Sequence, residues 1–307
     1  MTKERKTEKE PESSQQDATE YFKIRPPELP PPKDEYVWCH PPLPKCDKNT
    51  RLLLIGASGT GKTNVFKNLV ERYWVDPNTG RSVFDIILIF SPTLLQDPLY
   101  EIMFNNPILK DLIIPKLEID RELLLKLLNR KEDNLKILIF LDDFAYNKKV
   151  FELPEVVALY MRGRHANILP IISSQFYFSV DSSIRVNSTG MMIFRLKRAN
   201  EKQLLRIQLS TPRVHDEIFD AVLDEAHKEN KHDFLYCDIA NQRFYKNFEY
   251  ELAPDSGEER TEDTEMKTEE TKQQPEEDEI DRLIREEEET LLKRREGNKE
   301  DNIQQQQ

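Results

Sequence analysis

The sequence predicts an α/β fold, with a mostly parallel β-sheet that helices cover. Two observations support this prediction. Short, nearly continuous apolar runs such as residues 84–90 are typical of strands that are buried on both faces of a sheet. These runs alternate along the chain with stretches in which apolar residues recur at helical spacing. Because strands that alternate with helices favour a parallel sheet, we expect this architecture over residues 49–250.

Each expected element rests on one of these two patterns. The apolar runs predict strands at Leu52–Ile55, Phe84–Phe90, Ile137–Leu141, Ile168–Ser173, Met191–Phe194 and Phe234–Asp238. The helical spacing predicts helices at Lys62–Trp74, Leu99–Phe104, Arg121–Leu128, Pro154–Arg162, Glu201–Leu209 and Asp216–Glu229. The sequence shows no internal repeat.

Composition divides the 307 residues into three parts. Residues 1–48 form an N-terminal arm, polar at first and then proline-rich, which is expected to be disordered and then extended, as a spacer or as a strap across the domain. Residues 49–250 form the globular domain. Residues 251–307 hold 21 acidic and 9 basic residues, so this tail carries the whole net charge of −12. We expect the tail to be largely disordered, with a short amphipathic helix at 281–295 as the alternative.

The cysteines, the apolar runs and the charge balance bear on the compartment and the partners of the chain. The three cysteines suggest no disulfide framework, which favours a reducing compartment. The chain has no apolar run of transmembrane length, and its first residues lack the apolar core of a signal peptide. Residues 1–250 are balanced in charge, with 36 acidic and 36 basic residues (57 − 21 and 45 − 9), and this neither favours nor excludes a nucleic-acid partner.

A phosphate-binding loop of the pattern G-x-x-x-x-G-K-[ST] follows the first expected strand and opens the first expected helix. The loop consists of Gly56, Ala57, Ser58, Gly59, Thr60, Gly61, Lys62 and Thr63. Backbone N–H groups of such a loop cradle phosphate oxygens. Lys62 would reach the β- and γ-phosphates, and Thr63 would ligate Mg²⁺. The sequence therefore predicts a site for a nucleoside triphosphate.

Two acids end the strand expected at 137–141. The carboxyl ends of parallel strands form the edge at which ligands bind, so Asp142 and Asp143 are expected beside the phosphate loop. Asp142 would hold Mg²⁺ through its water shell, and Asp143 would orient and deprotonate an attacking water. A base at this position favours hydrolysis over transfer to another acceptor.

Three further side chains complete the predicted site. Gln175 ends the next strand and is expected to bridge the γ-phosphate and the attacking water, as a sensor of hydrolysis. Arg164 and Arg185 are candidates to neutralise charge on the transferred phosphate, and Arg185 is slightly preferred as an arginine that reaches a neighbouring subunit, with surface or structural arginine as the alternative. Each is expected near the edge that bears Asp143 and Gln175. His165 is expected to be structural.

The order of these motifs resembles that of the viral genome-packaging ATPases of the FtsK–HerA superfamily, in particular the poxvirus-type branch found also in giant viruses, virophages and related large DNA transposons. The resemblance covers about residues 52–206. It rests on the loop at 56–63, the two acids, Gly-Arg-His-Ala-Asn-Ile, Ser-Ser-Gln and Ile-Arg-Val-Asn. The wider superfamily usually has Asp-Glu where this chain has Asp142-Asp143, whereas the viral branch accepts Asp-Asp.

What the resemblance implies is a P-loop NTPase of the additional-strand type, an ATPase that uses ATP and Mg²⁺. It implies a homo-oligomeric ring that moves double-stranded DNA into a preformed capsid, with capsid proteins at the packaging vertex as partners. The protein would then act in the host-cell cytoplasm at sites of virus assembly, or in the virion. DNA would be held through its phosphates. Residues 146–149 and the cluster of Arg195, Lys197 and Arg198 are candidate contacts, with ordinary surface charge as the alternative.

Two other functions stay open at this point. A small-molecule phosphotransferase, such as a nucleotide or nucleoside kinase, would use the same phosphate loop but would need a pocket for its acceptor. A nucleotide switch without motor activity would bind ATP to support virion assembly. Hydrolysis that rises with double-stranded DNA separates the motor from both.

Overall fold

The computed structural model describes residues 42–252 except 131–133, 145–146, 197–198 and 210–215. Most of the N-terminal arm and the acidic tail after Leu252 lie outside the described residues. The amphipathic helix expected at 281–295 therefore lies outside them too.

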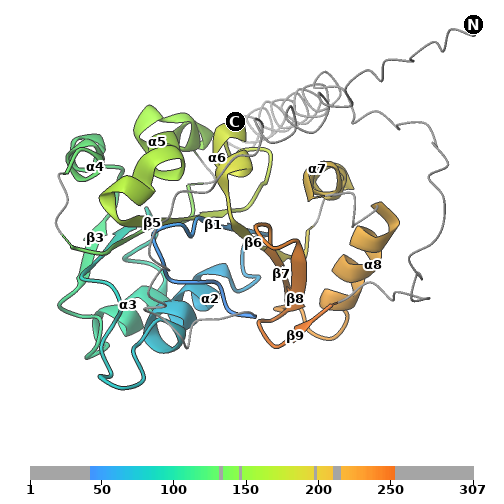
Figure 1. Ribbon diagram of the computed structural model, residues 1–307, viewed down its shortest axis with the longest axis horizontal. Coiled ribbons are helices and arrows are strands. Elements are labelled where there is room, and N and C mark those ends of the chain that lie inside the picture. Colours follow the sequence, from blue (N-terminus) through green and yellow to red (C-terminus); the bar gives the residue numbers. More distant parts are fainter. Residues whose placement is uncertain (1–41, 131–133, 145–146, 197–198, 210–215, 253–307) are drawn as a thin grey trace, which may run out of the picture. The chain divides into compact units, whose positions relative to one another are not determined.

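Nine strands of the described residues form one sheet, in the order β3-β2-β4-β5-β1-β6-β7-β8-β9 (Figure 1). The strands are β1 (Leu52–Ile55), β2 (Ile86–Phe90), β3 (Ile113–Lys116), β4 (Ile137–Leu141), β5 (Ile168–Ser174), β6 (Gly190–Phe194), β7 (Phe234–Asp238), β8 (Arg243–Lys246) and β9 (Tyr250–Glu251). The six strands from β3 to β6 in this order run parallel to one another, and β7, β8 and β9 continue the sheet in antiparallel pairs. The predicted α/β fold with a mostly parallel sheet is confirmed.

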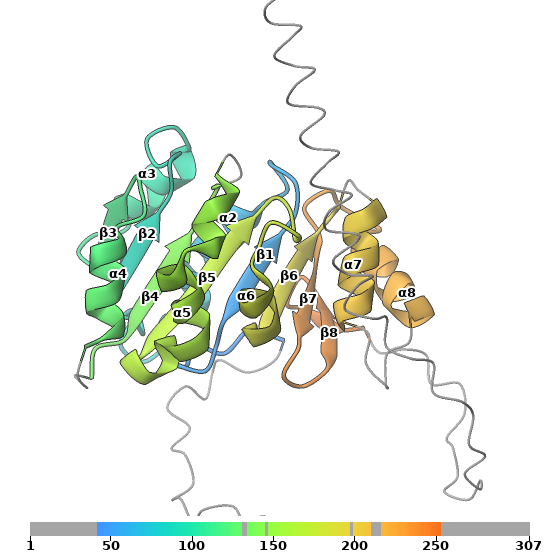
Figure 2. The same ribbon diagram turned by 90° about the horizontal axis from the view of Figure 1, so that it is seen from above.

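Helices cover both faces of this sheet. They are α2 (Lys62–Asn68), η1 (Leu69–Tyr73), α3 (Pro98–Phe104), α4 (Arg121–Leu128), η2 (Lys148–Glu152), α5 (Pro154–Arg162), η3 (Gly163–Ala166), α6 (Ser182–Asn187), α7 (Ala199–Leu209) and α8 (Asp216–Ala226). Figure 1 shows α4, α5 and α6 on one face and α2 and α3 on the other. In the view from above, α7 and α8 lie at the β7–β8 end of the sheet (Figure 2).

The two faces bury two separate apolar cores, because successive side chains of a strand point to opposite sides. In β1, Leu53 and Ile55 belong to the core that also includes residues of α4 to α8. Leu52 and Leu54 of the same strand belong to the core that includes α2 and α3. All four side chains are almost completely buried, which explains the continuous apolar run that predicted this strand.

The elements differ from expectation in two ways. β3, η2, η3, α6, β8 and β9 were not predicted. β3 contains Pro115, which argues against a central strand, and the strand indeed lies at the edge of the sheet, where proline is tolerated. The first helix, predicted as one element, is an α-helix that continues as the π-helical turn η1.

The last residues of the N-terminal arm pack on the domain. The indole Nε1 of Trp74 donates a hydrogen bond to the carbonyl oxygen of Pro44, at 3.1 Å. Cys46 is fully buried in the core beside α2. Residues 44–46 thus pack against the domain, whereas most of the proline-rich stretch, including the aromatic residues at 36–38, lies outside the described part of the chain.

Candidate nucleotide-binding site

The phosphate loop joins β1 to α2 and is shaped by its glycines. Gly61 has φ of 107°, in the left-handed region that favours glycine. A Cβ on Gly56 would lie 2.5 Å from the Cβ of Phe194 on β6, so no larger side chain fits between the loop and this strand. Within the loop, the hydroxyl of Thr60 donates to the carbonyl oxygen of Ala57, at 2.8 Å. The chain therefore needs glycine at these positions to turn from strand to helix.

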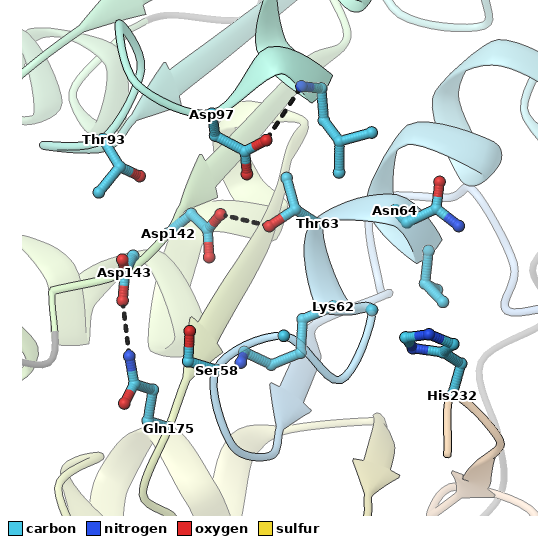
Figure 3. Close-up of a pocket in the computed structure, with 14 residues that line it drawn as sticks. Ser58, Lys62, Thr63, Asn64, Thr93, Asp97, Asp142, Asp143, Gln175 and His232 are labelled. Carbon is cyan, nitrogen blue, oxygen red and sulfur yellow. Dashed lines mark hydrogen bonds between the residues drawn. The ribbon is translucent and has the colours of Figure 1, made fainter. Parts of the chain in front are cut away.

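Strand order brings the predicted site residues to one edge of the sheet. β5 lies between β1 and β4, so the strand that ends in Gln175 separates the phosphate loop from the strand that ends in the two acids. This is the additional strand that the resemblance implies. Loop, acids and glutamine line one pocket of about 460 Å³ (Figure 3). The common direction of these strands thus brings together residues that lie up to 119 positions apart, from Gly56 to Gln175.

Lys62 lies at the floor of this pocket. Its side chain is buried, and Nζ donates hydrogen bonds to the carbonyl oxygens of Gly56, at 2.7 Å, and Ala57, at 3.0 Å. Burial lowers the pKa of this amine, and the nearby carboxylates of Asp142 and Asp143 oppose the shift. The ammonium group is thus partly desolvated and held at the loop, where phosphate oxygens would offer stronger acceptors than carbonyls.

The carboxylate of Asp142 is the acceptor of two hydroxyl groups. The Thr63 hydroxyl donates to its Oδ2 at 2.9 Å, and the Tyr100 hydroxyl donates to the same oxygen at 2.5 Å. Burial raises the pKa of Asp142, and these hydrogen bonds oppose the rise by favouring the ionised form. A hydroxyl and a carboxylate are the hard oxygen donors that Mg²⁺ prefers, so the residues fit the predicted metal site.

Asp143 and Gln175, predicted separately, are joined directly. The Gln175 amide Nε2 donates to Oδ1 of Asp143, at 2.9 Å, and Figure 3 shows the pair at one end of the pocket. Asp143 has φ of 57°, a left-handed conformation that is uncommon for a residue other than glycine. Both side chains are only partly buried. A carboxylate that accepts and an amide that donates at the same place can together orient one water molecule.

Six residues that line the pocket were not among the predicted site residues, and two of these, Asn64 and Val65, directly follow the phosphate loop on α2. Thr93, Asp97 and Leu99 follow β2, whose carboxyl end lies at the same edge, so the expectation for strand ends, applied to β2, would have found them. His232 precedes β7, and its Nδ1 lies 3.2 Å from the carbonyl oxygen of Thr60. Because β7 is antiparallel to β6, its amino end lies at this edge, and a pattern of apolar residues does not reveal strand direction.

The two arginines do not lie where they were expected. Arg164 is in η3, which precedes β5, so it lies at the opposite edge of the sheet from Gln175, roughly 20 Å of strand away. It is exposed, and its Nε lies 3.5 Å from Nε2 of His165. Arg185, on α6, is buried and its guanidinium lies 5.2 Å from the ring centre of Tyr177. The expectation that Arg164 lies near Asp143 is therefore wrong, because η3 precedes its strand, whereas Arg185 packs inward and is not among the residues that line the pocket.

The candidate DNA contacts are described only in part. Asn147 and Lys149 are exposed in the segment that follows β4, and Arg195 is exposed directly after β6. Arg195 donates a hydrogen bond to the carbonyl oxygen of His227. Tyr146, Lys197 and Arg198 lie outside the described residues, as does the side chain of Lys148. The described residues of both segments lie at the carboxyl edge of parallel strands, which is the edge of the pocket.

Two kinds of feature are absent from the described part of the chain. Over residues 42–252, apart from the gaps named above, no helix is long and apolar enough to span a membrane. In the same residues no three His, Cys, Asp or Glu side chains gather as a metal-binding group. The predicted Mg²⁺ site is of a different kind, because it uses one carboxylate and one hydroxyl.

Comparison with known proteins finds viral relatives. No family model matches the chain. The chain is 27% identical over 217 residues to an uncharacterized protein, 075L, of Invertebrate iridescent virus 6, covering 67% of this chain and 78% of the relative. It is 26% identical over 149 residues to an uncharacterized protein, 015R, of Frog virus 3, covering 48% of this chain and 44% of the relative.

Solved structures with a similar fold include a packaging enzyme. The genome packaging NTPase B204 from Sulfolobus turreted icosahedral virus 2, in complex with AMP, is 15% identical, with a TM-score of 0.46 over 66% of this chain and 97% of B204. EssC from Geobacillus thermodenitrificans, in a structure of its ATPases 2 and 3, is 14% identical, with a TM-score of 0.40 over 55% of this chain and 36% of EssC.

Proposed function

We propose that this chain is an ATPase that drives double-stranded DNA into a preformed viral capsid. The observation that supports ATP hydrolysis, the basis of this proposal, is the pocket itself. Lys62, the pair of Thr63 and Asp142, and the pair of Asp143 and Gln175 converge on one cavity from three neighbouring strands. Phosphate binding, metal binding and water activation each have their side chains there.

In this proposal, each of these side chains has a separate role in ATP hydrolysis. Lys62 binds the β- and γ-phosphates and neutralises their charge. Thr63 and Asp142 would hold Mg²⁺, which supplies further neutralisation of the phosphate oxygens when it is bound. Asp143 accepts the proton of the attacking water, and Gln175 fixes the direction of that water through its amide.

The Asp143–Gln175 hydrogen bond supports hydrolysis over phosphoryl transfer to a small molecule. The two side chains hold each other at 2.9 Å, so acceptor and donor for one water are already oriented. Release of the γ-phosphate would change the partners of Gln175, and this change would reach Asp143 directly. The same hydrogen bond would make Gln175 a sensor of the hydrolytic state.

The proposal also includes movement of DNA, a viral context and an oligomeric assembly. Two segments with exposed basic residues, Lys149 after β4 and Arg195 after β6, leave the sheet at the edge that holds the pocket, which supports a coupling of DNA contact to hydrolysis. The curated relatives are viral proteins, which supports a viral setting. We further propose a homo-oligomeric ring, capsid proteins at the packaging vertex as partners, and action at sites of virus assembly in the host-cell cytoplasm.

The organisation of the chain belongs to the same proposal. Residues 49–250 would form the ATPase domain, residues 1–48 an arm, and residues 251–307 an acidic tail that docks on the capsid or keeps DNA away until docking occurs. In this proposal the tail has no part in hydrolysis.

Hydrolysis with and without DNA tests the function. The full chain is incubated with Mg²⁺ and ATP, with or without linear double-stranded DNA, and its mass in solution is measured under the same conditions. We expect DNA to raise the hydrolysis rate and the mass to correspond to a ring. Slow hydrolysis at a rate that DNA does not change would favour the nucleotide switch. Transfer of phosphate to a nucleoside or nucleotide would favour the phosphotransferase.

A further inference from the structure

The pocket has two ends, and the proposed chemistry uses only one. Asp143 and Gln175 lie at the end where the γ-phosphate must be attacked. Figure 3 shows Asn64 and His232 at the opposite end, beyond Lys62 and Thr63. If the terminal phosphate of a nucleotide lies near Asp143, its nucleoside part must extend from the phosphate loop toward another part of the pocket.

His232 reaches this far end from the antiparallel part of the sheet. Its Nδ1 lies 3.2 Å from the carbonyl oxygen of Thr60. A Cβ built on Gly61 would lie 3.6 Å from the same nitrogen, so the imidazole lies directly beside the loop. The histidine is nevertheless exposed, because it lines the open pocket. An exposed aromatic ring at the mouth of a phosphate site offers both a flat surface and a hydrogen-bonding nitrogen.

The turn that carries His232 is held firmly. The backbone N–H of Asn230 donates to Oδ2 of Asp233, at 2.7 Å, and Nδ2 of Asn247 donates to Oδ1 of the same carboxylate, at 2.9 Å. The Oδ1 of Asn247 accepts from the backbone N–H of Phe234, at 2.9 Å. Asn247 follows β8 directly, so two strands fix the turn from behind. The position of the imidazole is thus built into the fold.

We infer that His232 binds the nucleoside part of the nucleotide and forms the base end of the pocket. This inference rests on the proposed ATP-binding function. Thr63 and Asn64 are consecutive on α2, and Figure 3 shows Asn64 on the His232 side of Thr63. Thr93 and Asp97 lie instead on the Asp142 side, as Figure 3 shows. The adenosine of ATP therefore extends toward His232 rather than toward α3.

Comparing two ligands isolates this contact. The affinities of the full chain for ATP and for inorganic tripolyphosphate, each with Mg²⁺, are measured by calorimetry for the unmodified protein and for His232→Ala. We expect affinity for ATP to fall by about 10-fold, the scale of a base–aromatic contact, and affinity for tripolyphosphate to stay unchanged. Unchanged tripolyphosphate binding also shows that the variant is folded.

His165→Ala is the matched control, because His165 is also an exposed histidine but lies in η3, at the opposite edge of the sheet from the pocket. We expect this variant to bind ATP as the unmodified protein does. The inference is overturned if His232→Ala weakens both ligands equally, since the histidine would then only shape the loop. It is also overturned if ATP affinity is unchanged in His232→Ala, or falls equally in His165→Ala. Failure of the unmodified protein to bind either ligand would instead refute the proposed ATP site.

Discussion

The parallel and the antiparallel parts of the sheet contribute to the pocket in different ways. The parallel strands β1, β4 and β5 are followed, just beyond their carboxyl ends, by Lys62, by the two acids and by Gln175, respectively. The antiparallel part delivers one side chain, His232, from the turn before β7. The groups to which we assign chemistry on phosphate thus follow strands of common direction, whereas the contact that we assign to the nucleoside comes from the antiparallel part of the sheet.

The largest expected effect lies in the parallel part, at Lys62. Replacement by alanine removes the ammonium group at the loop, so we expect Lys62→Ala to abolish ATP hydrolysis and to weaken ATP binding strongly. Tripolyphosphate binding should be weakened as well, in contrast to His232→Ala. Calorimetry with both ligands provides the measurement. Unchanged nucleotide affinity in Lys62→Ala would contradict the assignment of the phosphate site.

Arg164 extends the comparison to a neighbouring subunit. It is exposed, whereas Arg185 is buried against Tyr177, so of these two arginines Arg164 is the one available to another protomer without rearrangement. We expect Arg164→Ala to keep ATP binding and to lower hydrolysis by about 10³-fold or more, the scale of an arginine finger. Arg185→Ala should instead lower the melting temperature.

Mixing two variants decides whether Arg164 acts between subunits. Arg164→Ala still has a sound ATP site, and Lys62→Ala still has the arginine. An excess of Lys62→Ala added to Arg164→Ala should therefore restore part of the hydrolysis at mixed interfaces. Full activity of Arg164→Ala alone, or a loss that no mixing restores, speaks against an arginine supplied by the neighbour.

Asp143 tests the division of roles within the parallel part. Asp143→Asn keeps the size of the side chain but removes the base, so we expect ATP binding to persist and turnover to fall by about 10²-fold or more. Binding is measured by calorimetry and turnover by phosphate release. If Asp142→Asn kept the dependence on Mg²⁺ while Asp143→Asn lost it, the roles of the two acids would have to be exchanged.

The smallest effect is expected in the antiparallel part, at Asn247. Its φ is 53°, so glycine is the substitution that keeps the backbone and removes only the side chain. Asn247→Gly loses the hydrogen bonds to Asp233 and Phe234 that hold the turn of His232. We expect ATP affinity to fall by up to about fivefold, the scale of one hydrogen bond, with tripolyphosphate affinity unchanged. A loss as large as that of Lys62→Ala would mean that the turn supports the whole pocket.

The sequence predicted the positions of residues correctly where position follows from strand direction. Parallel strands place their carboxyl ends together, so the sequence alone assigns Asp142, Asp143 and Gln175 to one edge of the sheet. The same reasoning failed at Arg164, because η3 precedes β5 and therefore lies at the other edge. A motif in the sequence shows which residues are close along the chain but not on which side of the strand they lie.

Contacts between elements that are distant in the sequence could not be predicted, for a different reason. Tyr100 donates to Asp142 from a helix 42 residues earlier, and the sequence around Tyr100 shows only an ordinary amphipathic helix. His232 depends on the reversal of β7 relative to β6. Such contacts arise from tertiary packing, which local patterns do not encode.

Movement along DNA is the measurement that tests the central claim most directly. A linear duplex carries a third strand bound as a triplex at a distance from its end, and release of this strand is followed after addition of the full chain, Mg²⁺ and ATP. We predict that the unmodified protein releases the third strand at the rate set by ATP hydrolysis, and that Asp143→Asn does not. Vigorous DNA-stimulated hydrolysis without release of the third strand would contradict a motor that travels along double-stranded DNA.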